Sequence, residues 1–425
     1  MKLNTKRIIY IGLAFFTILM LWQVYNSYCP LMLRDLLTDR FNGDVEYLIG
    51  IIMAIDNILA LFMLPLFGNL SDKTKSKYGK RMPYIFIGTV LALIIFPFIP
   101  IFYINNNLVG TLICMALILL VMNMYRNPAV SLMPDITPKP LRAKANGIIN
   151  LIGYIGAIFA GALALVFTDR DSYIYTFIIT SVLMAIALII LIMKINENKI
   201  AKEVKEELEK GEEIASKNID FKEEKVLSKK DKRDLILIIL SVFIWFMGFN
   251  ALETFWSSYG EIYLKTDSWS LGTIIMTVFS ILTFVPAGNL TSKIGRKRII
   301  QIGLGCIIFS LGIASFIKSF NFLLMFCLAL CGIGWAMVNV ASYPMVVELA
   351  SNSNNGKYTG YYYTSSMIAQ SITPCCIGLL LGKIGWKYFF IYSFVFMIIA
   401  LIVFSFVSNN QKYQSKKGLE LFDQD

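Results

Sequence analysis

The sequence predicts an all-α integral membrane protein with twelve transmembrane helices in two parallel six-helix repeats. Of its 425 residues, 57% are hydrophobic and 16% are charged, whereas a soluble domain has about 25% charged residues. Apolar segments long enough to cross a bilayer, which takes about 20 residues, recur along the whole chain. In addition, short patterns from the first half of the sequence return in the second half in the same order.

Polar breaks separate the predicted spans from one another. The spans cover residues 8–33, 46–70, 83–104, 110–134, 144–168, 173–193, 235–263, 270–291, 298–317, 321–349, 357–382 and 386–408. The first span contains no charged residue, and no small-residue cleavage site follows it. We therefore interpret it as a retained helix and not as a signal peptide.

Lysine and arginine are concentrated in alternate breaks. The cation-rich segments are residues 1–7, 73–81, 139–144, 293–298 and 412–417. Because cytoplasmic loops carry an excess of these residues, we predict a multi-pass protein of the cell membrane with both termini in the cytoplasm. This distribution also accounts for the net charge of +11, so we predict the lipid bilayer and a small-molecule solute as partners, with no nucleic acid and no protein partner.

The spans and the charges together predict the domain organisation. The N-terminal six-helix half covers residues 1–193 and the C-terminal half residues 234–408, with a charged cytoplasmic linker at 194–233 and a cytoplasmic tail at 409–425. Glu and Lys recur at four-residue spacing in the linker, which is typical of a surface helix. A regulatory or partner-binding role is the alternative to a plain connecting role.

Two pattern matches indicate that the halves are repeats. The sequence G-N-L-S-D-K at residues 68–73 returns as G-N-L-T-S-K at residues 288–293. The pattern D-x8-K-x2-G begins at Asp135, and E-x8-K-x2-G begins at Glu348. Parallel repeats of this kind are typical of transporters that bind their substrate near the membrane midplane.

The break at residues 68–81 reads G-N-L-S-D-K-T-K-S-K-Y-G-K-R and is followed by Met-Pro-Tyr. It resembles the loop between helices 2 and 3 of the major facilitator superfamily, in the form carried by sugar–cation symporters. The whole chain from Trp22 to Gly385 is most similar to bacterial members of the sucrose-carrier group, related to the glycoside–pentoside–hexuronide cation symporters. The resemblance implies the major facilitator fold and proton-coupled uptake of a sucrose- or maltose-like sugar or glycoside by alternating access.

This loop also supplies a candidate cytoplasmic gate. We expect Gly68 to allow close helix approach, and Asp72 to accept charge-assisted hydrogen bonds from Arg81 or from a cation or helix N-terminus of the opposite half. Asp135 and Glu348, the acidic residues of the second pattern match, complete the predicted gate. The alternative is that the loop is a topology signal made of lysines.

Arg126 lies about two helical turns before Pro134, near the membrane midplane. An arginine there costs at least about 2.5 kcal/mol on insertion scales, so we expect it to face a polar cavity. Asn339 occupies the equivalent position in the second half. A structural ion pair without substrate contact is the alternative for Arg126.

Two acidic residues interrupt apolar spans and are the candidates for proton coupling. Asp56 lies in the second span and Glu253 in the seventh. A carboxyl withdrawn from water binds a proton more readily, which suits a residue that loads a proton from outside. The alternative is that they are neutralised gate residues hydrogen-bonded to Asn57 or Asn250.

The chain lacks acidic residues that the families it resembles carry. Leu119 stands where the plant sucrose carriers have an aspartate on helix four, so coupling uses another acid or is missing. Ala60 and Leu64 stand where the melibiose-type carriers have aspartates. Sodium coupling is therefore less favoured than coupling to the proton gradient.

Aromatic rings and amides inside the spans are typical of a pocket that stacks on sugar rings and bonds their hydroxyls. The substrate-binding candidates are Trp22, Tyr25, Asn26, Asn123, Arg126, Asn250, Trp335, Asn339 and Tyr343. For each aromatic residue taken alone, packing or lipid contact is the alternative.

The sequence contains no histidine, and its seven cysteines show no metal-ligand or disulfide pattern. We therefore predict no cofactor and no metal, and no enzymatic activity, because no nucleophile–base or metal-spacing motif occurs. A uniporter or exporter of sugars or other small organic solutes is the main alternative function. A membrane sensor is less favoured because no soluble domain is appended.

Overall fold

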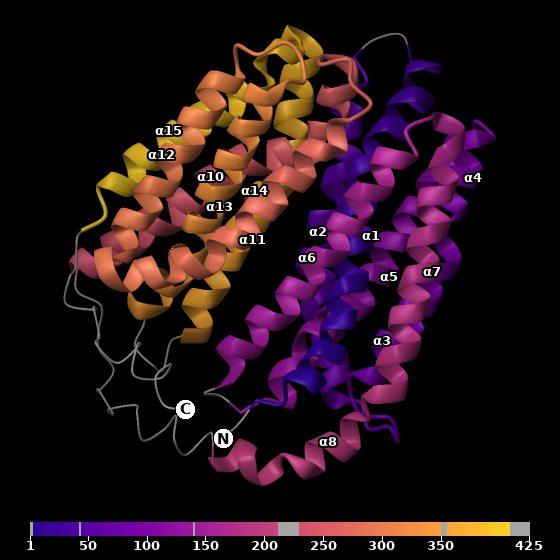
Figure 1. Ribbon diagram of the computed structural model, residues 1–425, viewed down its shortest axis with the longest axis vertical. Coiled ribbons are helices and arrows are strands. Elements are labelled where there is room, and N and C mark those ends of the chain that lie inside the picture. Colours follow the sequence, from indigo (N-terminus) through magenta and orange to yellow (C-terminus); the bar gives the residue numbers. More distant parts are fainter. Residues whose placement is uncertain (1–2, 42–43, 139–140, 211–228, 350–354, 409–425) are drawn as a thin grey trace. The chain divides into compact units, whose positions relative to one another are not determined.

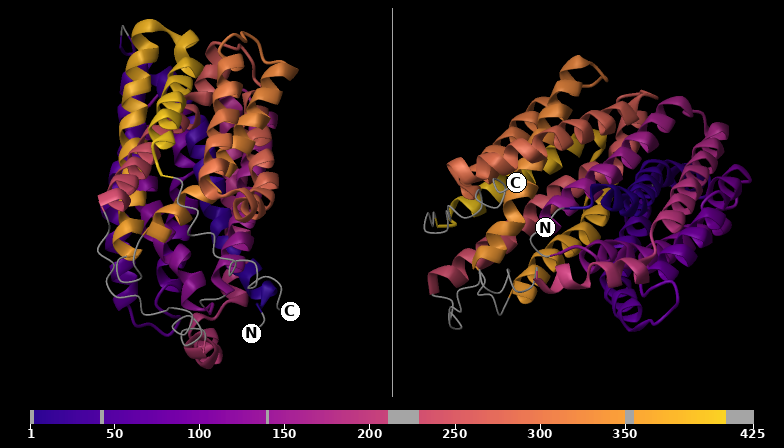
Figure 2. Two further views of the ribbon diagram at one scale, coloured as in Figure 1. Left: turned by 90° about the vertical axis from the view of Figure 1, so that its left-hand side faces the viewer. Right: turned by 60° about the horizontal axis from the view of Figure 1, so that its bottom comes forward.

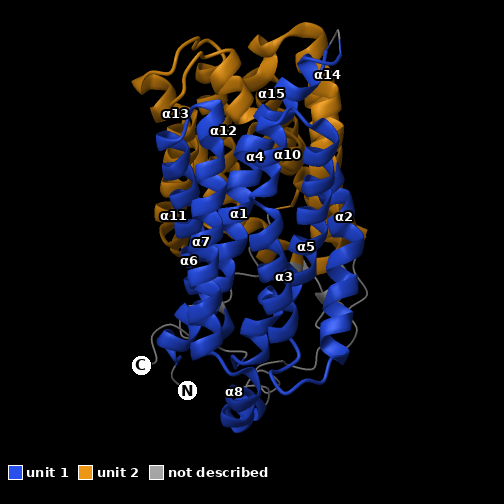
Figure 3. Cartoon of the chain, turned by 90° about the vertical axis from the view of Figure 1, so that its right-hand side faces the viewer, with its two compact units in different colours: residues 1–45, 55–220 blue, residues 46–54, 221–425 orange. Residues whose placement is uncertain are grey.

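The computed structural model is all-helical in its described residues, which are 3–41, 44–138, 141–210, 229–349 and 355–408. Within them, twelve helices are long and apolar enough to cross a membrane, which confirms the predicted number of spans. The chain divides into two compact units: unit 1 is residues 1–45 with 55–220, and unit 2 is residues 46–54 with 221–425 (Figure 3). The predicted tail at 409–425 lies outside the described residues.

Unit 1 contains the first six spans and a short helix that follows them (Figure 1). Its helices are α1 (Thr5–Thr38), α2 (Glu46–Lys73), α3 (Met82–Ile95), α4 (Phe98–Ile104), α5 (Leu108–Asp135), α6 (Arg142–Val166), α7 (Tyr173–Lys194) and α8 (Glu197–Glu203), with the 3-10 turn η2 (Arg170–Ser172) before α7. The first residues of α2, 46–54, group with unit 2.

Helix α1 forms the centre of unit 1 and packs mainly against α6 and α7. Close packing depends on small residues, as is usual between membrane helices. A Cβ atom added at Gly156 would lie 2.6 Å from the carbonyl oxygen of Phe16. The α1 and α6 backbones therefore approach too closely for any larger residue at this position.

The third span differs from the single predicted helix, because α3 ends at Ile95 and α4 begins at Phe98. Pro97 lies at the interruption. Proline has no backbone N–H and its ring clashes with the preceding turn, so the helix breaks there. The two pieces still form one candidate span from Met82 to Ile104.

Unit 2 repeats the architecture of unit 1, and its long helices run side by side (Figures 1 and 2). Its helices are α10 (Lys229–Ile262), α11 (Trp269–Ile294), α12 (Arg296–Ala314), α13 (Phe322–Leu349), α14 (Asn355–Ile384) and α15 (Phe389–Ser405), with the 3-10 turn η4 (Trp386–Tyr388) before α15. Helices α1 and α10 both have 34 residues, and α5 and α13 both have 28. These matched lengths agree with the predicted repeat.

The apolar outer surface of unit 1 is clearest on α7. One face of the helix is buried, with Phe177, Thr180, Met184, Ala187 and Leu191. The other face exposes large apolar side chains at helical spacing, namely Ile178, Val182, Ile186 and Ile189. A helix that is apolar all round and buried on one side has its other side in lipid, so this face lies against the bilayer.

Candidate functional site

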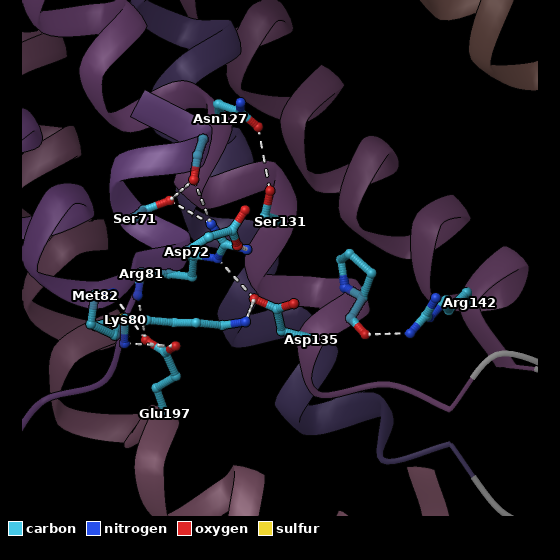
Figure 4. Close-up of polar contacts among 12 residues, drawn as sticks. Ser71, Asp72, Lys80, Arg81, Met82, Asn127, Ser131, Asp135, Arg142 and Glu197 are labelled. Carbon is cyan, nitrogen blue, oxygen red and sulfur yellow. Dashed lines mark hydrogen bonds and ion pairs between the residues drawn. The ribbon is translucent and has the colours of Figure 1, made fainter. Parts of the chain in front are cut away.

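Arg81 is the centre of a polar network at the ends of α2 and α5 (Figure 4). Its side chain is almost fully buried. Nε donates to Oδ2 of Asp135 at 2.8 Å, and the two terminal nitrogens donate to Asp72 and to the hydroxyl of Ser71. Guanidinium–carboxylate bonds are charge-assisted and directional, so one buried cation joins the ends of α2 and α5 to the start of α3.

Gly68 lies where α2 and α5 cross. A Cβ atom at this position would lie 2.4 Å from Nδ2 of Asn127 on α5. That amide nitrogen donates to the carbonyl oxygen of Leu64, four residues before Gly68 on α2. A larger residue at position 68 would displace the Asn127 side chain and break this hydrogen bond.

Glu197, at the start of α8, was not among the predicted site residues. Its buried carboxylate accepts three backbone N–H bonds, from Lys80 to Oε1 at 3.0 Å and from Arg81 and Met82 to Oε2 at 2.9 and 3.0 Å. The first N–H groups of a helix have no partner within the helix, and Pro83 has no N–H to offer. Glu197 therefore caps α3 and fixes the backbone that carries the Arg81 side chain.

The loop before Arg81 is shaped to fit α8. Gly79 has φ of +113°, and a Cβ atom there would lie 2.2 Å from Oε2 of Glu197. The side chain of Asn198 donates to the carbonyl oxygens of Ser76 and Lys77, both at 3.0 Å. Helix α8, which lies across the lower ends of the unit 1 helices (Figures 1 and 3), thus binds the loop through side chain and backbone.

A second cluster of predicted residues lies among the spans of unit 1. The rings of Trp22 and Tyr25 stack with centroids 6.1 Å apart at 20°, and the guanidinium carbon of Arg126 lies 5.7 Å from the centroid of the Trp22 ring. Tyr25 is buried. Asp56 is itself 4% exposed. Arg126, Trp22 and Tyr25 therefore form one cluster within unit 1.

The two predicted amides of unit 1 differ in their surroundings. Asn123 is buried, and its Nδ2 donates to the carbonyl oxygen of Leu119 at 2.9 Å within the same helix. Asn26 is half-buried, one turn after Trp22 on α1. Asn123 therefore uses one of its donors within α5.

The predicted residues of α13 form a separate cluster in unit 2. Trp335 stacks on Phe249 of α10, with ring centroids 3.6 Å apart and an interplanar angle of 2°. Asn339 follows one turn later and donates Nδ2 to the carbonyl oxygen of Trp335 at 2.9 Å. The hydroxyl of Tyr343 lies 3.3 Å from that of Thr359. Trp335 has thus one ring face covered by Phe249.

The predicted residues of α10 lie one turn apart on that helix. Asn250 is buried, and its carbonyl oxygen accepts a hydrogen bond from the Thr254 hydroxyl at 2.9 Å. Glu253 is exposed, in contrast to Asp56. The remaining predicted gate residue, Glu348, lies near the end of α13, and its side chain is outside the described part of the chain.

Comparison with known proteins identifies the family. The Major Facilitator Superfamily profile matches residues 11–285 and 266–421. The chain belongs to the major facilitator superfamily. This membership, with the twelve spans, confirms the superfamily resemblance of the sequence and the predicted fold.

An uncharacterized MFS-type transporter of Methanocaldococcus jannaschii is 26% identical over 384 residues, which is 88% of this chain and 89% of that protein. Among solved structures, the inward-open xylose transporter XylE from E. coli has a TM-score of 0.71 at 15% identity, covering 96% of this chain and 97% of that one. The nucleoside transporter NupG has a TM-score of 0.64 at 15% identity, and the match covers both chains fully. The structural matches show a shared fold.

This transporter of the major facilitator superfamily has a further polar network, which the sequence did not indicate, at the C-terminal end of α1. Asp35 binds Arg170 through two bonds, from Nε at 2.9 Å and from Nη2 at 3.1 Å. It also accepts the Tyr103 hydroxyl at 2.5 Å, and Arg170 donates to the Tyr173 hydroxyl at 2.6 Å. The network joins α1, α4 and α7 within unit 1.

No three His, Cys, Asp or Glu side chains come together as a metal ligand set among the residues that the structure describes. The cysteines in that part of the chain are free thiols. The candidate site thus consists of the Arg81 network and the two aromatic clusters described above.

Proposed function

We propose that this transporter takes up a sugar or glycoside together with a proton, by alternating access. The observation that carries the proposal is the cluster of Arg126, Trp22 and Tyr25, together with the buried Asp56 on α2 of the same unit. It combines a cation and a stacked aromatic pair, which suit a polar ring-shaped solute, with a buried carboxyl, which suits proton binding.

Asp56 is the better of the two proton-coupling candidates. Asp56 is 4% exposed, whereas Glu253 is exposed. Burial penalises the charged form of a carboxyl, so the buried acid is the better proton carrier. Sodium is less favoured than the proton because the neighbouring turns of α2 carry the apolar residues Ala60 and Leu64.

We assign the cytoplasmic gate to Gly68, Asp72, Arg81 and Asp135. Arg81 bonds both carboxylates, and Gly68 leaves room for the Asn127 side chain that bonds α2. Asp72 is 56% exposed at its side chain, so its bond is the one most easily exchanged during a transport cycle. The described contacts of this network all lie within unit 1.

We further propose that the protein lies in the cell membrane with both termini in the cytoplasm. The end of unit 1 that carries the Arg81 network also carries Lys73, Lys77 and Lys80, as the positive-inside rule requires of a cytoplasmic end. Membership in a transporter family also agrees with a non-enzymatic role.

A uniporter or exporter of sugars or other small organic solutes is the alternative. The observation in its favour is that Leu119, where the plant sucrose carriers have an acid, is a buried apolar residue of α5.

Uptake of sucrose, maltose and other glycosides into proteoliposomes, with and without an inward proton gradient, separates the two functions. Symport predicts accumulation above the outside concentration only with the gradient. Equilibration without accumulation would contradict it and support the uniporter.

A further inference from the structure

The C-terminal end of α15 is held by two cations from neighbouring helices of unit 2. Lys297, in the first turn of α12, donates Nζ to the carbonyl oxygens of Ser405 at 3.0 Å and Val407 at 2.5 Å. Arg233, near the start of α10, donates Nη2 to the carbonyl oxygen of Phe406 at 3.5 Å. Helix α15 packs against both α10 and α12, so the two cations meet at one helix end.

Cations stabilise the free carbonyl groups at a helix C-terminus, but this role uses only part of what the two side chains offer. Among the described residues, every bond of Arg233 comes from Nη2, including one to the carboxylate of Asp234 at 3.3 Å. The Nε and Nη1 donors of Arg233 are therefore left over, and so is one of the three donors of Lys297. The Arg233 side chain is 59% exposed, so its remaining donors can reach a group outside the protein.

Little negative charge balances these cations. Residues 229–234 carry four cations and two acids, and residues 293–298 carry four cations and no acid. Asp234 is 1% exposed and already bonds Arg233 and the Ser408 hydroxyl. The other acid, Asp231, is half-buried and has an interaction of its own. The surface at this end of unit 2 is therefore positively charged.

An apolar stripe of α15 leads to the two cations. Its exposed side chains recur at helical spacing and are Ile391, Val395, Ile399, Ile402 and Phe406. The opposite side of the helix is buried, and a helix that is apolar all round and buried on one side has its other side in lipid. The stripe ends at Phe406, which is 68% exposed and whose carbonyl oxygen accepts the Arg233 bond.

The two flanking helices show the same order of charge and apolar surface. On α10, the exposed Lys232 comes one turn before the exposed Ile236, and on α12 the exposed Arg298 comes one turn before the exposed Ile302. Residues four apart lie on the same side of a helix. Each cation therefore lies at the end of an apolar exposed face, which matches a molecule with a charged head and an apolar body.

We infer that this end of unit 2 binds an anionic phospholipid, whose phosphate accepts bonds from Arg233 and Lys297 and whose acyl chains lie along the α15 stripe. Basic sites beside membrane-spanning helices bind anionic headgroups, and a guanidinium offers a phosphate two parallel N–H donors. The occupant is a lipid and not a soluble anion, because a soluble anion would use the cations and leave the adjoining stripe unused.

The test uses the purified full-length protein in a neutral detergent, with added dioleoyl phosphatidylglycerol, dioleoyl phosphatidylcholine or inorganic phosphate. The shift of the melting temperature with ligand concentration gives the apparent affinity. Each cation near an anionic headgroup contributes about a fivefold preference. We therefore expect phosphatidylglycerol to bind about 20- to 30-fold more tightly than phosphatidylcholine.

Five variants accompany the wild type. Arg233→Gln and Lys297→Gln should each lower the preference about fivefold. Because both cations also cap α15, Arg233→Lys and Lys297→Arg test the same positions with the charge kept, and each should retain most of the preference. Lys265→Gln is the control, because Lys265 is exposed beyond the other end of α10, and it should leave the preference unchanged.

Each contrary result contradicts a different part of the inference. Equal binding of the two lipids by the wild type would overturn it without any variant. An unchanged preference in both glutamine variants would overturn the site assigned to Arg233 and Lys297. Inorganic phosphate that stabilises the protein as much as phosphatidylglycerol, with both effects lost in the glutamine variants, would retain an anion site and overturn the lipid.

Discussion

Glu197 holds the backbone of Arg81 through a hydrogen bond of 2.9 Å from the Arg81 N–H to Oε2. The two N–H groups on either side of Arg81 bond the same carboxylate. Glu197 of α8 thus holds the backbone of Arg81, while the guanidinium of Arg81 bonds Asp72 and Asp135. The segment that follows the sixth span is therefore part of the machinery that positions the proposed gate.

Glu197→Gln should destabilise this arrangement, because the amide keeps one acceptor oxygen but turns its NH2 group toward backbone N–H groups. Each lost charge-assisted bond costs about 1.5–3 kcal/mol. We expect a lower melting temperature and slower transport with unchanged substrate affinity.

Glu203→Gln is the control for that substitution. Glu203 ends the same helix but is 46% exposed and pairs with Arg7 near the surface, where such pairs contribute about 0–1 kcal/mol. Equal effects of the two substitutions would contradict the role assigned to Glu197.

Gly79→Ala should destabilise the protein for two reasons that act together. The φ of +113° strains any residue with a side chain, and the added methyl group would lie 2.2 Å from Glu197. We expect a loss of about 1–3 kcal/mol, measured by thermal unfolding in detergent.

Gly147→Ala is the matched control for Gly79→Ala. Gly147 is inside α6 and has no atom within 4 Å of an added Cβ, so alanine there should stabilise by up to about 1 kcal/mol. A neutral Gly79→Ala would show that α8 does not contact this loop.

The sequence predicted the fold well because the signals for it are local. A run of apolar residues indicates a span wherever it occurs, and Pro97 could have been used to predict the break between α3 and α4. The motif at residues 68–81 likewise indicated Asp72 and Arg81 as gate residues, because both belong to one short segment of the sequence.

Contacts between distant segments were not predictable in the same way. Glu197 bonds Arg81 although more than a hundred residues separate them in the chain. Because the segment around Glu197 is rich in Glu and Lys, the sequence does not distinguish Glu197 from the other acidic residues there. The one local signal was its position, directly after a span and next to the helix-capping Asn196. The placement of Arg126 over the Trp22 ring also needed the three-dimensional structure, because the two residues lie on different helices.

Asp135→Asn should slow transport more than Asp72→Asn. Asp135 is 24% exposed at its side chain and binds both Arg81 and Lys80, whereas Asp72 is 56% exposed and binds Arg81. The less exposed carboxylate is less screened by water. Both substitutions should leave solute affinity nearly unchanged, and a variant that lost binding at normal turnover would contradict the gate assignment.

The most direct test of proton-coupled uptake compares two transport assays on Asp56→Asn in proteoliposomes, with Glu253→Gln as the matched variant in unit 2. Asparagine cannot exchange a proton but preserves the shape of aspartate. We predict that Asp56→Asn loses accumulation driven by an inward proton gradient while counterflow exchange of the same solute continues, and that Glu253→Gln keeps both. Gradient-driven accumulation at wild-type level in Asp56→Asn would contradict the account.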